Sequence, residues 1–249
     1  MPLVSIITPA YNCKNAIENT VNSVLSQTIF DWEWIIVEDC STDGTFDIIK
    51  KLIGNDNRVK IFKTEKNSGA AVARNLGIEM ASGQYIAFLD ADDTWEKDKL
   101  EKQISFMEQG DFAISYSKYY LLYSNGKIRK YSPRRKTIKY KQLLWKTDIG
   151  CLTGIYDSSK LGKRYMPVDC VKREDHGFWL DLTRDGTVAH LYPEYLATYR
   201  IADNSVSSKK IKMIKYQYLL YRKHEHFSVI KSLWFLLLRI LNKLFAKYL

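Results

Sequence analysis

Cysteine is scarce in this sequence, and long hydrophobic runs are missing. The four cysteines form no Cys-x-x-Cys pair and stand far apart, at Cys13, Cys40, Cys151 and Cys170. This spacing argues against a disulfide framework and a zinc site, and it fits a reducing cytosol. The longest uninterrupted apolar run covers residues 233–238, far short of the about 20 residues of a spanning helix. No basic stretch followed by an apolar one opens the sequence, so no secretory signal is expected.

Two glycine-rich phosphate-binding elements are also missing. The sequence contains neither Gly-x-Gly-x-x-Gly nor Gly-x-x-x-x-Gly-Lys-Ser/Thr. Dinucleotide-binding and P-loop proteins hold their phosphates with these elements, so both classes are disfavoured.

The composition is that of a folded globular protein, with 46% hydrophobic and 13% aromatic residues among 249. This length suits one domain, with or without an appendage. The net charge of +10 is unevenly distributed: −7 over residues 1–117, +10 over 118–146, −2 over 147–199 and +9 over 200–249. The chain therefore does not present one uniform basic surface.

Short apolar runs alternate with helical patterns in the first third of the chain. Strands are expected at residues 3–8, 34–37, 59–62 and 85–89. The segments between them carry apolar residues three or four apart, which indicates helices. This order predicts an α/β fold with buried, mostly parallel strands and crossover helices on both faces.

Beyond residue 111 the alternation is less regular. Strands are expected at 112–117, 119–123, 128–131, 188–192 and 195–201, a hairpin turn at 124–127, and a short helix at 174–182. From residue 211 onward the pattern is helical.

Three carboxylates, Asp90, Asp92 and Asp93, follow directly on the apolar run 85–89. Burying unpaired carboxylates is costly, so we expect these groups to be accessible and to share a cation. Oxygen ligands suit Mg²⁺ or Mn²⁺, and such an ion with open positions binds diphosphates. The alternative is an acidic turn in which Asp93 caps the following helix.

Polar residues also follow two earlier strands, and ligands bind beyond the carboxyl ends of parallel strands. Tyr11 could lie against a base, and Asp39 could accept a base N–H. Alternatively, Asp39 and Asp43 cap the turn at 39–44, and Asn12 caps the first helix.

Four motifs in order resemble family 2 glycosyltransferases: residues 4–12, 36–45, 67–75 and 86–93. Residues 1–95 look like the nucleotide-sugar half of that family, whose GT-A fold is a Rossmann-like sheet flanked by helices. The resemblance implies a GT-A domain over 1–205, with an acceptor half at 96–205, and leaves a basic helical tail at 206–249.

The resemblance assigns donor contacts and a metal ligand. Asp92 would ligate a divalent cation, Mn²⁺ or Mg²⁺, that bridges the diphosphate of a nucleotide sugar, most often UDP-linked. The implied donor-binding residues are Thr8, Pro9, Tyr11, Asn12, Glu38, Asp39, Asn67, Arg74, Asp90, Ala91 and Arg200. Arg74 could instead be a structural ion pair. For Arg200 the match is incomplete, because Ala202-Asp203 occupy the place where many members have a His.

Glu174 and Asp175 match the family's acidic pair before an aromatic residue. Asp175 is the candidate base for the acceptor hydroxyl, and Glu174 orients it or contacts the acceptor. One displacement inverts the anomeric configuration. These carboxylates could instead only complement a helix dipole, and His176 is a rival base. The Gln-x-x-Arg-Trp element of processive synthases is missing, which favours single additions.

The tail combines a cationic edge with an apolar stripe. Helical spacing places Lys231, Arg239, Lys243 and Lys247 on one side. The other side carries Ile230, Leu233, Trp234, Leu237, Leu241, Leu244, Phe245 and Tyr248. This pattern is typical of a helix lying in an anionic membrane surface. Alternatively the helix packs on its own domain or on a second subunit in a homo-oligomer. His224, Glu225 and His226 are expected to be solvated.

The basic segment 118–146 falls in the expected acceptor region, where it could meet the diphosphate of a polyprenyl-linked acceptor or lipid headgroups. Together these features predict a cytoplasmic enzyme on the inner face of the plasma membrane that extends a lipid-linked oligosaccharide for a bacterial surface polysaccharide. The rival interpretation is a basic RNA-, DNA- or membrane-binding module without catalysis. It is disfavoured because it leaves the acidic strand ends unexplained and no nucleic-acid motif is visible.

Overall fold

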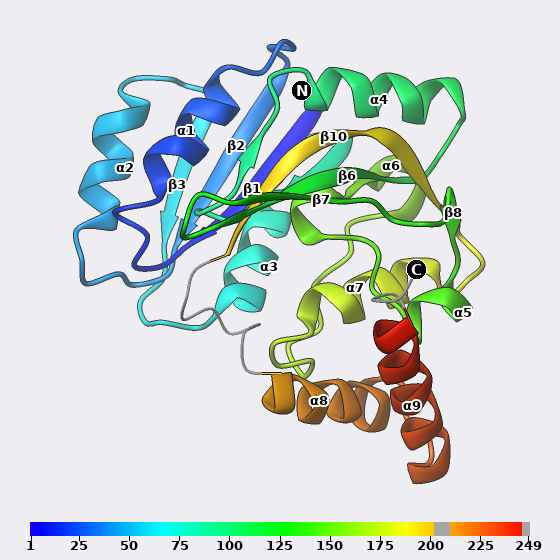
Figure 1. The fold of residues 1–249 in the computed structure, drawn as a ribbon. Coiled ribbons are helices and arrows are strands. Elements are labelled where there is room, and N and C mark those ends of the chain that lie inside the picture. Colours follow the sequence, from blue (N-terminus) through cyan, green and yellow to red (C-terminus); the bar gives the residue numbers. More distant parts are fainter. Residues whose placement is uncertain (202–209, 246–249) are drawn as a thin grey trace.

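A computed structural model describes the backbone of residues 1–201 and 210–245 and the side chains of 1–201 and 212–242. One mixed sheet runs through it, with helices against both faces (Figure 1). The strands are β1 (Val4–Ala10), β2 (Trp32–Glu38), β3 (Val59–Lys63), β4 (Tyr85–Phe88), β5 (Thr94–Trp95), β6 (Ile114–Tyr123), β7 (Ile128–Tyr131), β8 (Thr137–Ile138), β9 (Ile155–Asp157) and β10 (Ala189–Ile201).

The strand order is β3-β2-β1-β4-β9-β6-β10-β5, with β7 paired to β6 and β8 to β10. The first four strands pair in parallel, as the alternating pattern predicts. β9 then enters antiparallel between β4 and β6, and β6 and β10 pair in parallel. The carboxyl ends of β1, β2 and β4 therefore meet at one edge.

The helices are α1 (Ile17–Leu25), α2 (Thr45–Ile53), α3 (Ala70–Met80), α4 (Lys99–Gln109), α5 (Tyr140–Leu143), α6 (Ser158–Leu161), α7 (Glu174–Thr183), α8 (Lys210–Leu219) and α9 (Val229–Phe245). A 3₁₀ turn lies at Cys151–Thr153, and a π turn, Leu220–His224, joins α8 to the segment before α9.

The core has two layers because strand side chains alternate between the faces of the sheet. Ile6 of β1 packs with α1, α2 and α4, whereas its neighbour Ile7 packs with α3 and α7. Tail residues Leu220, Tyr221 and Phe227 belong to the second layer. The tail thus packs on the domain at its start. The predicted boundary at 205/206 lies outside the described residues.

Two strands are longer than the sequence predicts. The segments 112–117 and 119–123 form the single strand β6, because Lys118 stays within the ladder and pairs with Tyr195. The segments 188–192 and 195–201 likewise form β10, whose register against β6 shifts between Tyr192 and Ala197. A local irregularity of this kind accommodates residues that do not fit the regular pairing. The Pro-Glu pair in this stretch therefore does not end the strand.

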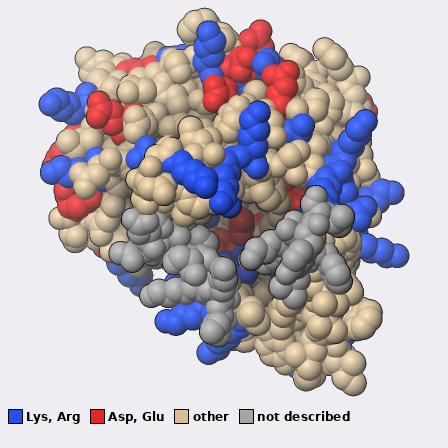
Figure 2. All heavy atoms as spheres, viewed as in Figure 1, with Lys and Arg blue, Asp and Glu red and all other residues tan. Residues whose placement is uncertain are grey.

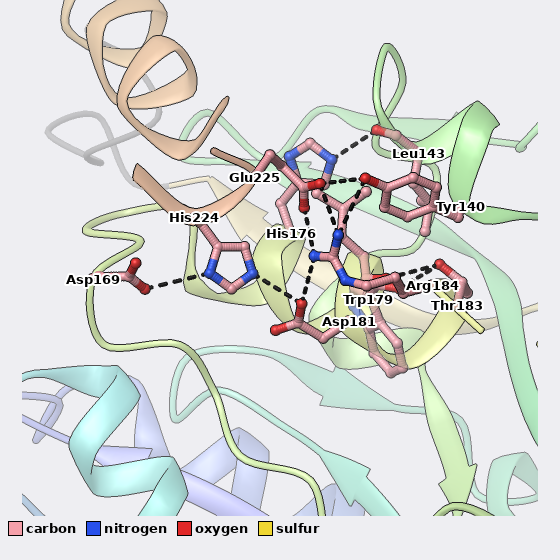
Figure 3. A network of polar contacts seen from close by, with 11 residues as sticks. Tyr140, Leu143, Asp169, His176, Trp179, Asp181, Thr183, Arg184, His224 and Glu225 are labelled. Atoms are coloured by element: carbon pink, nitrogen blue, oxygen red, sulfur yellow. Dashed lines mark hydrogen bonds and ion pairs between the residues drawn. The ribbon is translucent and has the colours of Figure 1, made fainter. Parts of the chain in front are cut away.

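The expectation that His224 and Glu225 are solvated is wrong. Figure 3 shows both side chains pointing into a network with α7. Glu225 is 7% exposed and accepts two bonds from the Arg184 guanidinium, at 3.0 and 2.9 Å. The Nε2 atom of His224 lies 3.0 Å from Asp181 Oδ1, and its Nδ1 lies 3.5 Å from Asp169 Oδ1. These contacts fasten the π turn to α7.

Arg239, predicted on the cationic edge of the tail, does not lie on an exposed edge. The Arg239 side chain turns toward the domain and donates from Nη2 to Thr147 Oγ1 at 2.6 Å. Lys231 is exposed, with its ammonium 3.7 Å from the Phe227 ring centre. The side chains of Lys243 and Lys247 lie outside the described part. None of the described helices is long and apolar enough to cross a bilayer.

Candidate functional site

A cavity of about 420 Å³ opens at the carboxyl ends of β1, β2 and β4. Nine of the predicted donor and metal residues line it: Pro9, Tyr11, Asn12, Asp39, Asn67, Arg74, Asp90, Ala91 and Asp92. The sheet produces this arrangement because parallel strands release their following loops on the same edge. Five predicted residues do not line it: Thr8, Glu38, Glu174, Asp175 and Arg200.

The rim of the cavity is held by a loop-to-loop contact through Asn12. Its side-chain Oδ1 accepts from the Thr42 backbone N–H at 2.9 Å, and its backbone has a left-handed φ of 46°. The alternative that Asn12 caps the first helix is wrong, because Ala16 occupies that position. Tyr11 beside it is 49% exposed, so its ring face is available to a planar ligand.

Asp39 holds the loop before α3 rather than its own turn. One carboxylate oxygen accepts from Ser68 N–H at 2.9 Å and the other from Gly69 N–H at 2.7 Å. The expected capping of the 39–44 turn by Asp39 is therefore wrong. Asp43 alone fulfils that alternative, with Thr45 N–H donating to Oδ1 at 3.0 Å. The Thr64 hydroxyl also donates to Oδ1, at 2.8 Å, so Oδ2 is the Asp39 oxygen that keeps lone-pair capacity for a ligand.

Thr8 and Glu38 support the cavity from beneath. The Thr8 hydroxyl is fully buried and accepts from Trp34 Nε1–H at 2.9 Å. Glu38 is also buried, and one of its oxygens accepts from the Ser41 N–H. Thr8 therefore ties β1 to β2, and Glu38 holds the loop that follows β2.

The three carboxylates after β4 differ in exposure. Asp93 is 1% exposed, so the expectation that all three are accessible is wrong. Its Oδ1 accepts from Arg200 N–H at 2.9 Å, while its buried Oδ2 has no partner among the described residues. The alternative role for Asp93 as a helix cap is also wrong, because α4 begins at Lys99, after Asp98.

The charges of this cluster repel one another. Burial raises the pKa of Asp92, and the neighbouring Asp90 raises it further. Burial also raises the pKa of Asp93 well above its usual range, with both other carboxylates adding to the effect. A cation would relieve this repulsion, so these residues fit the implied Mn²⁺ or Mg²⁺.

Arg74 links the cavity to α7. Its guanidinium forms an ion pair with Asp90, and its Nη1 lies 4.0 Å from Glu174 Oε1. The side chain is only 5% exposed, and burial opposes its charge, but Asp90 and its neighbours raise its pKa. Arg74 thus forms the structural ion pair that was the alternative to a donor contact, and it also lines the cavity.

The acidic pair lies at the first turn of α7, where the helix dipole favours negative charge. Burial raises the pKa of Glu174, with Arg74 acting against the rise. His176, the rival base, is fully buried. Its Nε2 lies 2.8 Å from the Leu143 carbonyl and its Nδ1 3.3 Å from Gln217 Oε1. Burial lowers its pKa far below the usual value, so His176 is a core residue.

Two residues near α7 were missed by the sequence reasoning. Arg173 directly precedes the acidic pair, and Arg239 reaches the same region from α9. The signal for Arg239 is its spacing. It follows the buried Ser232 by seven residues and the half-buried Phe235 by four, which places it on the inner face of α9.

Comparison with known proteins agrees with this geometry. Residues 5–165 match the family model described as Glycosyl transferase family 2. The chain is 45% identical over 234 residues to "Putative teichuronic acid biosynthesis glycosyltransferase TuaG" of Bacillus subtilis, covering 94% of this chain and 92% of the relative. It is 38% identical over 217 residues to the UDP-Glc:alpha-D-GlcNAc-diphosphoundecaprenol beta-1,3-glucosyltransferase WfgD of Escherichia coli, covering 87% and 84%.

Solved structures share the fold. Staphylococcus aureus TarS 1–349 in complex with UDP-GlcNAc superposes with a TM-score of 0.72 at 20% identity, over 96% of this chain and 72% of that one. A longer TarS chain also superposes, with a TM-score of 0.68 at 21% identity. The match covers 90% of this chain but only 44% of that TarS chain. The Pyrobaculum calidifontis mannosyltransferase PcManGT in complex with GDP-Man and Mn²⁺ superposes with a TM-score of 0.70 at 17% identity. The match covers 94% of this chain and 70% of that one.

The predicted GT-A-type α/β fold is therefore confirmed. The family match covers the cavity and the strands that build it. This chain belongs to glycosyltransferase family 2.

Proposed function

We propose that this enzyme transfers one sugar from a UDP-linked donor to a hydroxyl of a polyprenyl-diphosphate-linked acceptor, with inversion. The observation that carries the proposal is the continuity of the cavity with the acidic pair. Arg74 pairs with Asp90 in the cavity and approaches Glu174 behind it. This continuity supports donor binding and proton removal in one site.

The donor side follows from the residues that line the cavity. Tyr11 lies against the base, Asp39 accepts a base N–H, and Asp90 lies near the ribose. Asp92 is the protein ligand for Mn²⁺ or Mg²⁺, which when bound supplies positive charge for the diphosphate. Arg200 adjoins the same cluster, because its backbone N–H donates to Asp93 Oδ1 at 2.9 Å, and its charge lowers the pKa of Asp92 and Asp93 against the effect of burial.

Asp175 acts as the base. It takes the acceptor hydroxyl proton while the oxygen attacks the anomeric carbon from the face opposite the leaving group. The bond between that carbon and the diphosphate oxygen breaks, and UDP leaves with the electron pair. Glu174 orients the acceptor or Asp175. A single displacement of this kind inverts the configuration.

The names of two relatives support the acceptor class. WfgD and WfaP of Escherichia coli, at 38% and 40% identity, are named for transfer to a GlcNAc-diphosphoundecaprenol. TuaG is named for teichuronic acid biosynthesis. We infer that the product is likewise a lipid-linked precursor of a bacterial surface polysaccharide, made at the inner face of the plasma membrane.

The outer face of α9 supports a membrane-bound location. Its apolar stripe is exposed, at 82% for Ile230, 52% for Leu233, 57% for Trp234, 47% for Leu237 and 37% for Leu241. On the face drawn in Figure 2, the described atoms at this end of the molecule carry few charged side chains. A helix with such a face lies in a membrane interface, with nearby cations attracted to anionic lipid.

Ligand-dependent melting tests the donor assignment. UDP with Mn²⁺ should raise the melting temperature of the wild type, and UDP alone should raise it less. In Asp92→Ala the Mn²⁺-dependent part should disappear. A rise with single-stranded oligonucleotides and none with UDP and Mn²⁺ would favour the rival nucleic-acid-binding function instead. Screening nucleotide sugars for slow hydrolysis then identifies the sugar.

A further inference from the structure

Two arginines beside the acidic pair lack carboxylate partners. Arg58, Arg74 and Arg184 each form an ion pair. Arg173 and Arg239 form none within 4.0 Å among the residues that the structure describes. Two buried N–H groups, Arg173 Nε and Arg239 Nη1, have no hydrogen-bond partner in the part of the chain that the structure describes. Each points to an acceptor that the protein itself does not provide.

The two guanidinium groups also repel each other. Burial lowers the pKa of Arg173 to about 10, and the nearby charge of Arg239 contributes to the shift. Burial likewise lowers the pKa of Arg239, while the nearby Tyr221 and the charge of Asp175 act against the shift. Asp175 attracts both guanidinium groups, but it forms no close ion pair with either, so the cost of burying two neighbouring cations is only partly offset. An anion bound between them would reduce this cost further.

The surroundings leave both groups available. Arg239 donates from Nη2 to Thr147 at 2.6 Å and also bonds the Tyr221 side chain, which fixes its direction but leaves Nη1 unused among the described residues. The nearby Asp148 is already bound by Lys146 at 2.9 Å and by the Tyr131 hydroxyl at 3.1 Å. Glu174 is engaged elsewhere, because its Oε1 lies 4.0 Å from the Arg74 guanidinium.

We propose that Arg173 and Arg239 bind the diphosphate of the lipid-linked acceptor. Guanidinium groups suit this ligand, because their planar N–H pairs match phosphate oxygens in a bidentate way. This inference rests on the proposed function and makes α9 part of the acceptor site.

Position favours the acceptor over the donor. Neither arginine lines the donor cavity, whereas Arg173 adjoins the Glu174-Asp175 pair that meets the acceptor hydroxyl. Arg239 stands on the inner face of α9, and the exposed apolar stripe occupies the outer face of the same helix. A diphosphate held here has its sugar toward Asp175 and its polyprenyl chain toward the face of α9 that we assign to lipid.

Calorimetric titration with farnesyl diphosphate, a short polyprenyl diphosphate, tests the site in the full-length protein. Arg173→Met and Arg239→Met should each weaken its binding at least about tenfold, in line with a lost charge-assisted bidentate contact. Each should leave the affinity for UDP with Mn²⁺ within about twofold of the wild type. Exposed neighbours supply matched controls: Lys172→Met, directly before Arg173, and Lys231→Met, on α9, each remove a charge and should change neither affinity.

Farnesyl diphosphate binding unchanged in both arginine variants would overturn the proposal. A parallel loss of UDP affinity would also overturn it, because the pair would then serve the donor. The two proposals fail separately, since a wild type that binds farnesyl diphosphate but not UDP with Mn²⁺ contradicts only the donor assignment. If Arg239→Met does not fold, Arg239→Lys replaces it. The single ammonium should weaken farnesyl diphosphate binding at least about threefold, and unchanged affinity there rejects the proposal.

Discussion

Individual side chains at this site serve the loops as well as the ligand. Asp39 uses both carboxylate oxygens on the Ser68 and Gly69 amides, and Asn12 uses its amide oxygen on Thr42. A motif read from sequence gives the residue type at a position but not the atom it bonds. This is why the alternatives for Asp39, Asp93 and His176 could be decided only from three-dimensional contacts.

Asp175→Asn should reduce sugar transfer at least about 100-fold, because the amide cannot take the acceptor proton. The affinity for UDP with Mn²⁺ should stay nearly unchanged, since Asp175 does not line the donor cavity. Initial transfer rates and UDP titration measure the two effects. Asp185→Asn, at an exposed carboxylate two residues beyond α7, is the control and should be fully active. Normal turnover in Asp175→Asn would remove this residue from the base role.

Lys99→Met should stabilise the protein most at low pH. Lys99 is fully buried, its ammonium donates to Gln103 Oε1 at 2.7 Å, and burial lowers its pKa to about 7. In the unfolded chain the pKa is about 10.4, so that state binds more protons between these values and wild-type stability rises with pH there. The gain from methionine should therefore be about 2–4 kcal/mol at pH 6 and shrink toward pH 10.

Urea unfolding at pH 6, 8 and 10 measures this gain, with the exposed Lys97→Met as control. A gain that does not change with pH would show that the ammonium is not the cause.

At the scale of elements, close packing fixes the position of each strand end. Gly77 of α3 lies so near β1 that an added Cβ would stand 2.6 Å from Ile7 Cγ2. β10 carries a register shift that no periodicity reveals, because the shift depends on its partner β6. The short strands β5 and β9 were not predicted either, since two or three residues carry too little pattern.

Gly83→Ala should destabilise the fold by about 2–3 kcal/mol. The new Cβ would lie 2.6 Å from Ser5 N and 2.7 Å from Val4 C, and these backbone atoms cannot move without disturbing β1. Chemical denaturation measures the loss. Gly150→Ala is the control, because its nearest contact would be a Leu152 side-chain atom at 3.2 Å. Equal stability of the two variants would show that β1 yields at this point.

At the scale of the whole molecule, charge and apolar surface are separated. Figure 2 shows Lys and Arg side chains in several groups with Asp and Glu between them, not as one continuous basic surface. The start of the tail packs into the core, while the outer face of α9 stays exposed. The tail therefore has one side that packs on its own domain and an opposite, exposed side that could contact a membrane.

Vesicle sedimentation tests the exposed face of α9. The wild type should partition onto vesicles containing phosphatidylglycerol, and less so at high salt. A Leu233→Ser, Leu237→Ser double variant should partition at least about tenfold less, because two leucine side chains that would enter the lipid are lost. Ile128→Ser, at a 61%-exposed apolar residue on β7, is the control. If the double variant partitions normally but loses a dimer seen by light scattering, the face binds a second subunit.

The sequence by itself determined the α/β class, the parallel order of the first strands and the residues gathered at their ends. It could do so because hydrophobic periodicity and motif order are local properties of the chain. Only the tertiary structure decided which carboxylate is buried, that Arg74 spans from Asp90 to Glu174, and that Arg239 turns inward beside Arg173. Those features depend on contacts between segments distant in sequence, and packing, not local pattern, selects them.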